Sequence, residues 1–434
     1  MAIRTISNTG GSYNSTSTWV EAIVPNSSDD VVATATSGQL TVNVASAARS
    51  FDFTNYTNTL TVNAIWTVSG VATQVFVSGM TISGTSNIAI TGTGASITSN
   101  GKTIPNLSIS NNKTLNDNLN VVNITVAVGA NFTGNAINCS GNWNSSITSV
   151  GGTAIFNLIG NGSVDFGNYT GSGGLNLNAS GTLTGGTIGI GLSSNTTLNY
   201  SGGTLSQMKV KIISTPITIN ANGAQFETFD AIGGATEQVI NLSSEFKVKY
   251  FNSSNLSYNP NTTNSIRIAG TGALNVTESM NLLPIINNAT GTMQYKPFNI
   301  SFSTGVTHTI NILNLSGFQA ITPNTTNSFA FHTFKSSTSG TRADINLLNP
   351  TQSIIANTDI TDINFTGPAV YTLCSGGTIS NSLNVTNGVI GGGSSISGGA
   401  WTFVNWLYKI ETLLQKKTIK TIQNGKNSSD KYRN

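Results

Sequence analysis

Residues 100–126 read NGKTIPNLSISNNKTLNDNLNVVNITV, a polar run with a regular apolar pattern. Its apolar residues recur at every second position, as in Leu119 and Val121, which is the period of a half-buried β-strand. The alternation slips by one residue after Val121, because Val122 and Ile124 have the opposite parity. Such a slip turns every later side chain to the other face of the strand, so we expect a bend or bulge at this point.

The composition of the whole chain is typical of a polar β-protein. Only 8% of its 434 residues are charged, whereas soluble globular proteins carry about 25%. Asn, Ser, Thr and Gly replace the missing charge, and these residues favour turns and are poor in helix interiors. Ile, Val and Thr are abundant and regularly spaced, which argues against disorder. We therefore predict an ordered all-β protein.

Short alternating runs fill the middle of the chain, each followed by Gly or Asn, as in SGMTISG, NIAITG and GLNLNASG. Two or three runs make a unit of about 20–25 residues, which fits one coil of a β-solenoid. About 15 such coils at the usual strand spacing would build a shaft on the order of 70 Å long. We expect a right-handed parallel β-helix or solenoid, and a β-sandwich is the competing all-β interpretation.

Four regions differ in their sequence pattern. Residues 1–62 are predicted to form an N-terminal β segment or cap, residues 63–290 the β-helical shaft, and residues 291–400 an irregular β-helical distal region. Residues 401–434 carry seven Lys or Arg and two acidic residues. Their apolar positions have helical spacing, so we predict a short basic amphipathic α-helix over about 402–422 and a polar, flexible tail.

One face of the predicted C-terminal helix is a candidate assembly surface. Three roles stay open for this helix: it could cap the open end of the solenoid, where unpaired strand edges invite aggregation; it could bind copies of itself or another particle protein; or it could lie on an anionic membrane, which we rank last. The residues of this face are Trp401, Trp406, Leu407, Ile410 and Leu414.

Charge and targeting signals narrow the classes of partner. The net charge is +3, and the first 400 residues hold twelve basic and fourteen acidic residues, so most of the chain has no electrostatic basis for binding nucleic acid. The N-terminal MAIRTISNTGG lacks the apolar segment of a secretory signal. No apolar run reaches the roughly 18 residues of a membrane span. We therefore expect a protein made in the cytoplasm without a signal peptide.

The acidic residues do not form an obvious catalytic pair. Asp359 and Asp362 are three residues apart, as are Glu227 and Asp230. On a strand, an odd spacing sends two side chains to opposite faces. The sequence also lacks a Gly-x-Ser-x-Gly elbow and a Gly-rich phosphate loop. We predict no catalytic residue and no cofactor, although acids on different coils could still meet in space.

Histidine and cysteine give no stronger signal for a site. His308 and His332 are the only histidines, and their separation is near the expected coil length, so they could stack. No Cys/His cluster accompanies them, and we predict no metal site. Cys139 and Cys374 are isolated and are interpreted as inert residues of the core.

One aromatic cluster is a candidate for binding sugars. Tyr250, Phe251 and Tyr258 occur together in KYFNSSNLSYNP. We favour a role in the hydrophobic core for these side chains. The alternative is a surface platform on which the face of a sugar ring stacks, and the three residues are therefore the candidate glycan contacts.

Several segments resemble virion structural proteins of tailed phages, of the tail-fibre or appendage type with parallel β-helix-like repeats. SNTGGSYNSTSTWVEAIVPNSSDDVV is similar to the opening of these proteins and, more weakly, to the G8 domain at the start of some β-helices. The basic helix lies outside the resemblance. The other segments that carry it are NGKTIPNLSISNNKTLNDNLNV (100–121), GGTAIFNLIGNGSVDF (151–166), GGLNLNASGTLTGG (173–186), ISFSTGVTHTINILNLSG (300–317), FKSSTSGTRADINLL (334–348) and TDITDINFTG (358–367).

The resemblance implies a structural virion component, a phage tail or head fibre that is made in the host cytoplasm and takes part in host-surface attachment. Its expected partners are other virion proteins, host surface glycans and copies of itself, with a homotrimer as one expected assembly. Two alternatives stay open. A tailspike-like polysaccharide depolymerase would need paired acids, and a cellular surface adhesin would need a route of export that the N-terminus does not suggest.

Overall fold

The computed structural model describes residues 1–388 with internal gaps. The predicted C-terminal helix and tail, including Trp401, Trp406, Leu407, Ile410 and Leu414, lie outside the described residues, as does Tyr258. The gaps are 127–129, 194, 213–214, 232–236, 253–264, 283–284, 288–293, 297–298, 317, 320–328, 331, 350–352, 357, 368–370, 375–378 and 384.

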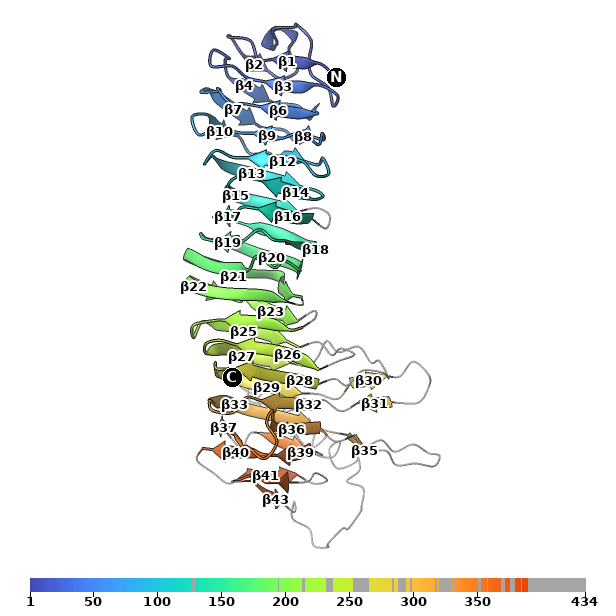
Figure 1. Ribbon diagram of the computed structural model, residues 1–434, viewed down its shortest axis with the longest axis vertical. Helices are drawn as coiled ribbons and strands as arrows, with labels where there is room; N and C mark the ends of the chain where they lie inside the picture. The colour runs from blue at the N-terminus through green and yellow to red at the C-terminus, as the bar shows by residue number, and fades with distance from the viewer. Residues whose placement is uncertain are drawn as a thin grey trace, which may run out of the picture.

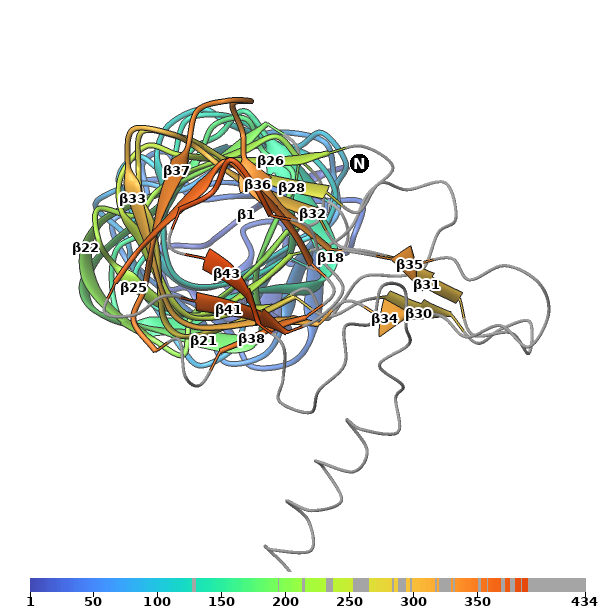
Figure 2. The ribbon, with the colours of Figure 1, turned by 90° about the horizontal axis from the view of Figure 1, so that it is seen from below.

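The strands form coils that stack along one axis (Figure 1). Viewed along that axis, the coils superimpose around a common interior (Figure 2). Three ladders of strands run along the shaft, and we call them faces 1, 2 and 3. Their pairings are parallel throughout the described coils, so the all-β solenoid is confirmed and the antiparallel β-sandwich is wrong. The right-handed sense of the coil stays a prediction.

Face 1 links eighteen strands from one coil to the next. At about 4.8 Å per step, this ladder is roughly 80 Å long. Its strands are β1 (Ile3–Thr5), β3 (Asp30–Val32), β6 (Ser50–Asp52), β9 (Gln74–Val75), β12 (Ser96–Thr98), β14 (Lys113–Leu115), β16 (Ala130–Gly134), β18 (Trp143–Gly152), β20 (Gly162–Tyr169), β21 (Leu175–Leu192), β23 (Lys209–Ile212), β25 (Gln225–Asp230), β27 (Phe246–Asn252), β29 (Leu274–Leu282), β33 (Thr307–Ser316), β38 (Ile354–Ala356), β41 (Tyr371–Cys374) and β43 (Val385–Gly388).

Faces 2 and 3 share their long strands with face 1 or with each other, because these strands bend around the corners of the shaft. Face 2 adds β5 (Ser46–Ala48), β8 (Trp66–Val68), β11 (Ile88–Ile90), β13 (Thr103–Ile109), β15 (Leu119–Val126), β22 (Thr196–Ser206), β37 (Ala343–Leu347) and β40 (Ile363–Thr366). Face 3 adds β2 (Gly11–Ser12), β4 (Leu40–Val42), β7 (Thr59–Val62), β10 (Thr81–Ser83), β17 (Ile137–Cys139), β19 (Phe156–Leu158), β24 (Ile217–Asn220), β26 (Gln238–Leu242), β28 (Ser265–Gly270), β32 (Asn299–Phe302), β36 (His332–Ser336), β39 (Thr358–Thr361) and β42 (Ile379–Ser380).

The bend predicted after Val121 is present in β15. Residues before the slip pair with β17 on face 3, since Val121 lies opposite Cys139. Residues after it pair with β18 on face 2, where Ile124 lies opposite Trp143. Val121 is buried, whereas Val122 stands at the corner with 36% of its surface exposed. The slip in the apolar pattern therefore marks the point at which the coil turns from one face to the next.

The interior of the shaft is filled by side chains from alternate strand positions. One column of face 3 stacks five apolar residues in register, each fully buried. A column of this kind is continuous from coil to coil, so the core has no boundary between neighbouring coils, as expected for a solenoid. The five residues are Leu119, Ile137, Phe156, Leu175 and Leu198.

Asparagine side chains form a hydrogen-bonded column on the outside of face 3. The Nδ2 of Asn138 donates to Oδ1 of Asn120, and Asn157 donates to Asn138 in the same way, each over 2.8 Å. Asn176 and Asn199 continue the column over 2.8 and 2.9 Å. Parallel in-register strands place like residues directly above one another, and amide side chains then pair along the stack. The abundance of Asn in this chain therefore has a structural cause.

The N-terminal end of the shaft is closed by its own chain. Residues 18–20 run antiparallel to β1: Val20 N–H donates to the Thr5 carbonyl over 2.9 Å, and Ser7 N–H donates to the Thr18 carbonyl over 2.8 Å. The 3₁₀-helix η1 (Thr16–Thr18) precedes this segment. The outer edge of the first coil is thereby paired from Thr5 onward, which shortens the edge that other chains could extend.

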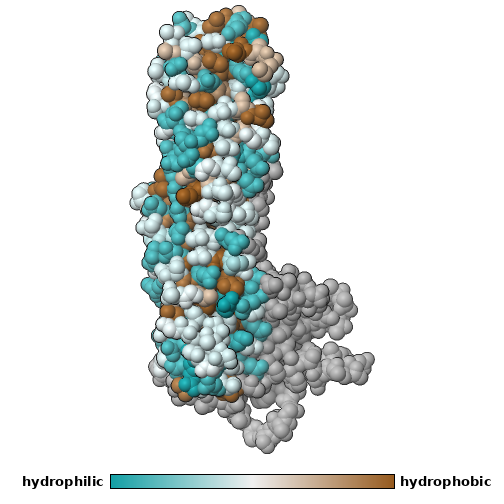
Figure 3. All heavy atoms as spheres, viewed as in Figure 1, coloured by the Kyte–Doolittle hydropathy of each residue, from teal (hydrophilic) through white to brown (hydrophobic). Residues whose placement is uncertain are grey.

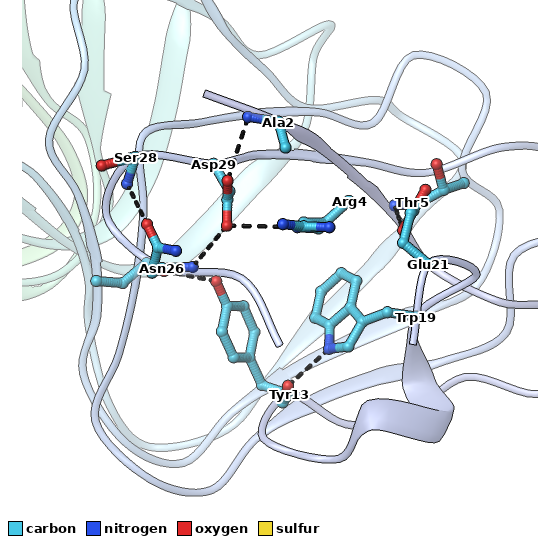
Figure 4. A network of polar contacts seen from close by, with 10 residues as sticks. Ala2, Arg4, Thr5, Tyr13, Trp19, Glu21, Asn26, Ser28 and Asp29 are labelled. Carbon is cyan, nitrogen blue, oxygen red and sulfur yellow. Dashed lines mark hydrogen bonds and ion pairs between the residues drawn. The ribbon is translucent and has the colours of Figure 1, made fainter. Parts of the chain in front are cut away.

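Polar side chains fix the same cap (Figure 4). The buried carboxylate of Asp29 accepts hydrogen bonds from the N–H groups of Ala2 and Asn26 and from Arg4 Nε. Burial acts to raise the pKa of Asp29, but the hydrogen bonds from Asn26, Arg4 and Ala2 outweigh it and hold the pKa below its usual value. Trp19 Nε1 donates to the Tyr13 carbonyl over 2.8 Å, which holds the indole over the first coil.

The distal part of the shaft carries lateral excursions. Two antiparallel hairpins leave the shaft on the same side (Figures 1 and 2). They are β30 (Ile285–Asn287) with β31 (Gln294–Lys296), and β34 (Phe318–Gln319) with β35 (Phe329–Ala330). The coils continue past both hairpins with their parallel pairing intact.

We predict that Asn157→Ala lowers the free energy of unfolding by about 1–2 kcal/mol, because it removes one donor and one acceptor from the column and each such bond contributes about 1 kcal/mol. Chemical unfolding followed by circular dichroism measures this change. The exposed Asn178 of the adjacent coil is the matched control, and Asn178→Ala should change stability by less than about 0.5 kcal/mol. Equal losses in the two variants would contradict a stabilising role of the column.

Candidate functional site

The ladder of face 2 is interrupted at one level of the shaft. Its upper run ends with β22, where Leu205 pairs with Leu183 of β21. Its lower run begins with β25, where Gln225 pairs with Lys247 of β27. No ladder pairing joins β22 to β25 in this described part of the chain, although Glu227 N–H donates to the Met208 carbonyl over 2.8 Å. Faces 1 and 3 stay paired at this level, through β23 and β24.

A groove lies at this interruption, with a volume of about 300 Å³. Its lining is mostly polar. Phe226 belongs to the buried core beneath the groove, and Leu205 is partly buried against that core. The lining residues are Leu205, Ser206, Gln207, Gln225, Phe226, Glu227 and Lys249.

One ion pair crosses the groove from coil to coil. Lys249 Nζ lies 2.7 Å from Glu227 Oε2, and the two side chains are 41% and 27% exposed. The hydrogen bond and the negative charge of Glu227 raise the pKa of Lys249 above its usual value. The groove therefore contains one cation and one anion that neutralise each other.

One glutamine of the groove has a side-chain hydrogen bond to a neighbouring coil, and the other has an unusual backbone conformation. Gln225 Nε2 donates to Thr277 Oγ1 over 3.2 Å, which bridges two coils. Gln207 has a φ of +53°, a backbone conformation that L-residues other than Asn and Asp rarely adopt. Such conformations occur preferentially at binding and active sites, where the surrounding structure maintains them.

The charged residues of the shaft concentrate around this groove. Five basic and five acidic residues lie between Lys209 and Glu278. Besides the ion pair in the groove, Arg267 contacts Glu237 at 2.9 Å and Lys247 contacts Glu245 at 3.4 Å. Because cations and anions are equal in number and mostly paired, this band of the shaft has little net charge.

The structure separates the aromatic residues that the sequence suggested as glycan contacts. Tyr250 is 39% exposed and directly follows Lys249 of the groove. Phe251 is fully buried, and its ring packs on Phe229 with centroids 5.0 Å apart. A surface role for Phe251 is therefore wrong, because strand alternation turns it into the core when Tyr250 faces outward. Tyr250 stays a candidate contact.

The acidic residues considered for catalysis do not converge in the described coils. Asp362 is buried and accepts hydrogen bonds from Asn381 and from Gly340 N–H, and these two bonds lower its pKa against the effect of burial. Asp359 belongs to strand β39, where its register partner is Thr333. Burial raises the pKa of Asp230, whose register partner is Asn252. Asp362 and Asp230 therefore have local structural partners.

The two histidines lie on different faces of the shaft. His308 lies opposite Ile345 on face 2, whereas His332 lies opposite Thr358 on face 3. Cys139 is buried, and burial raises the pKa of its thiol to about 11, which agrees with an inert core residue. Among the described residues, no group of three His, Cys, Asp or Glu is placed to hold a metal ion.

Sequence reasoning missed the buried charge of Lys113. Lys113 occupies an inward position of β14 and is almost completely buried. Its ammonium group donates to the carbonyl of Gly92 over 2.7 Å and to that of Ser110. Burial lowers the pKa of Lys113 to about 8. The position could have been suspected from the alternation, since Lys113 has the same parity as the buried Leu115.

In the described part of the chain, none of the helical segments has the length and apolar character to traverse a bilayer. Comparison with known proteins finds no matching family model, no similar curated protein and no similar solved structure.

His308 provides a test of the packing by pH. Its Nδ1 accepts from Leu274 N–H over 3.0 Å, so Nε2 carries the proton and faces the Ser303 carbonyl at 3.3 Å. Burial lowers the pKa of His308 from 6.5 to about 4, against the opposing effects of the Ser303 hydrogen bond and the negative charge of Asp344. Between these two pH values His308 is therefore protonated in the unfolded chain but neutral in the folded chain.

We therefore predict that His308 makes the protein lose up to about 3 kcal/mol of stability as pH falls from 6.5 to about 4. His308→Gln keeps an acceptor for Leu274 N–H but has no titrating group, so its stability should depend less on pH in this range. Urea unfolding at several pH values measures both proteins. Parallel curves for the two proteins would show that His308 is not the group responsible.

Proposed function

We propose that this protein is a structural component of a virion, a fibre or appendage on the tail or head of a tailed phage that takes part in attachment to the host surface. The observation that carries the proposal is the uninterrupted ladder of face 1, which makes a single chain into a rod roughly 80 Å long. The resemblance of several segments to virion proteins of this type supports the same function.

The mechanical properties of the rod follow from its contacts. Backbone hydrogen bonds run along the shaft axis between coils, and the apolar columns and the Asn column run parallel to them. Bending the shaft would stretch all of these contacts on one side together. A rod of this kind holds its tip at a fixed distance from its base, which is what an attachment fibre requires.

The surface of the rod suits a role outside the cell. Side chains of intermediate hydropathy cover much of the view in Figure 3, with scattered polar and apolar residues. An uncharged polar surface depends little on ionic strength, because screening acts on charges. The expected partners are other virion proteins at the base, host glycans along the exposed shaft, and further copies of the chain, with a homotrimer as one possible assembly.

The direct test is to locate the chain on particles. Virions purified from the phage that encodes this sequence are expected to contain the protein by mass spectrometry, and gold-labelled antibodies against the shaft should decorate a tail or head appendage. Absence of the protein from purified virions would overturn the proposal.

A second measurement separates a fibre from a depolymerase. The purified protein is incubated with capsular and other cell-surface polysaccharides, and the products are analysed by size. We expect no shortening of the chains. Released oligosaccharides would show that the protein is an enzyme and not a purely structural fibre.

A further inference from the structure

We propose that the groove between β22 and β25 binds a short, uncharged oligosaccharide segment at the side of the shaft. This inference rests on the proposed attachment function and names the surface that would carry it. The groove combines a break in the strand ladder, amide side chains and a neutralised ion pair within one small space, and each of these features bears on the class of ligand.

The first feature is the interrupted ladder. On face 2, β22 and β25 belong to successive coils but are not joined by a ladder, so Leu205 and Phe226 are not register partners. Backbone donors and acceptors that pair elsewhere in the ladder therefore border the groove. Peptide groups at such an edge need hydrogen-bond partners, and a ligand rich in hydroxyl groups supplies both donors and acceptors.

The second feature is the set of side chains. Gln207 and Gln225 each offer an amide oxygen and an amide nitrogen, and Ser206 adds a hydroxyl. Gln225 is already positioned by its bond to Thr277, so less side-chain entropy is lost when a ligand binds. These groups form hydrogen bonds with sugar hydroxyls without requiring a charge on the ligand.

The third feature is charge. The ammonium of Lys249 is already paired with Glu227 at 2.7 Å. A phosphate, sulfate or carboxylate placed here would gain Lys249 only by competing with Glu227, and it would be repelled by that carboxylate. A neutral sugar can instead accept from Lys249 and donate to Glu227 without breaking the pair. The site therefore favours neutral sugars over acidic ones.

Size and surroundings limit the ligand further. A volume of about 300 Å³ is at the lower end of the range of small-molecule sites, which is about 300–1,000 Å³. The site therefore suits one or two sugar units of a longer chain. Tyr250 follows Lys249 and exposes 39% of its surface, so its ring can contact a unit outside the groove through its apolar face while its hydroxyl stays in water.

The test uses the full-length protein and a panel of immobilised oligosaccharides. The panel contains neutral hexose and N-acetylhexosamine chains together with sialylated and sulfated chains, and affinities for the best neutral ligand are then measured by calorimetry. We expect binding to neutral members of the panel. Gln225→Ala and Lys249→Gln should each weaken that binding at least fivefold.

Two matched variants control for general effects of substitution. Gln39→Ala removes an exposed glutamine near the N-terminal cap, and Glu237→Gln breaks the exposed ion pair with Arg267; both should bind within twofold of the wild type. The circular dichroism spectrum and unfolding midpoint establish that each variant is folded. Should one groove variant fail to fold, the other decides the result.

Three outcomes contradict the groove as a site for neutral sugars: no binding to any member of the panel, binding to acidic members only, or binding that both folded groove variants retain. None of these outcomes removes the protein from the virion, so detection on purified particles tests the proposed function independently. A protein absent from virions that still binds neutral sugars through Gln225 and Lys249 would support the groove and refute the virion proposal.

Discussion

The in-register parallel stacking of coils is the constraint on which the rest of the structure depends. Once one coil lies on the next, every outward position has a fixed neighbour above and below it at about 4.8 Å. Like charges in such a column would repel each other at every step, whereas amides pair, as Asn138 and Asn157 do. The low charge of the chain, the repeated Asn and the long apolar columns are three consequences of this one arrangement.

The same constraint explains where binding surfaces can arise. A perfectly regular ladder satisfies its own backbone groups and offers a ligand little. Departures from regularity are therefore informative: the groove lies where face 2 fails to pair β22 with β25, and Gln207 adopts its positive φ at the same level. The lateral hairpins β30–β31 and β34–β35 are a second kind of departure, in which the chain leaves the shaft and returns to the same ladders.

The fold was accessible from the sequence because the period of the apolar pattern is a local property. Alternation predicted the strands, turn residues predicted the corners, and the slip after Val121 located one corner to the residue. Burial was harder to predict where the position of a residue in the alternation and the polarity of its side chain pointed to opposite answers. Lys113 has the parity of an inward residue but carries a charge. It is buried because its ammonium group donates to backbone carbonyls on two coils. Phe251 appeared with Tyr250 in one cluster, and only the strand register separated them.

The candidate site could not be predicted from the sequence for a different reason. Its residues come from three coils, and the gap among them depends on which strands pair and which do not, a property that no local pattern encodes. Gln225 and Lys249 are ordinary surface residues when they are considered singly. The sequence predicted a shaft on the order of 70 Å, whereas the ladder of face 1 spans roughly 80 Å, because β1, β3 and β6 of the N-terminal segment add coils to it.

The in-register stack can be tested by cross-linking on face 3. Asn157 and Asn176 are direct register partners, and neighbouring strands lie at about 4.8 Å, within the Cα range that a disulfide spans. Asn157 and Asn199 are two coils apart, at roughly 9.6 Å, which is too far. Cysteines at 157 and 176 should therefore form a disulfide on mild oxidation, detected by peptide mass spectrometry, while cysteines at 157 and 199 should not. A bridge in the second pair and none in the first would contradict the stacking register on which the shaft is built.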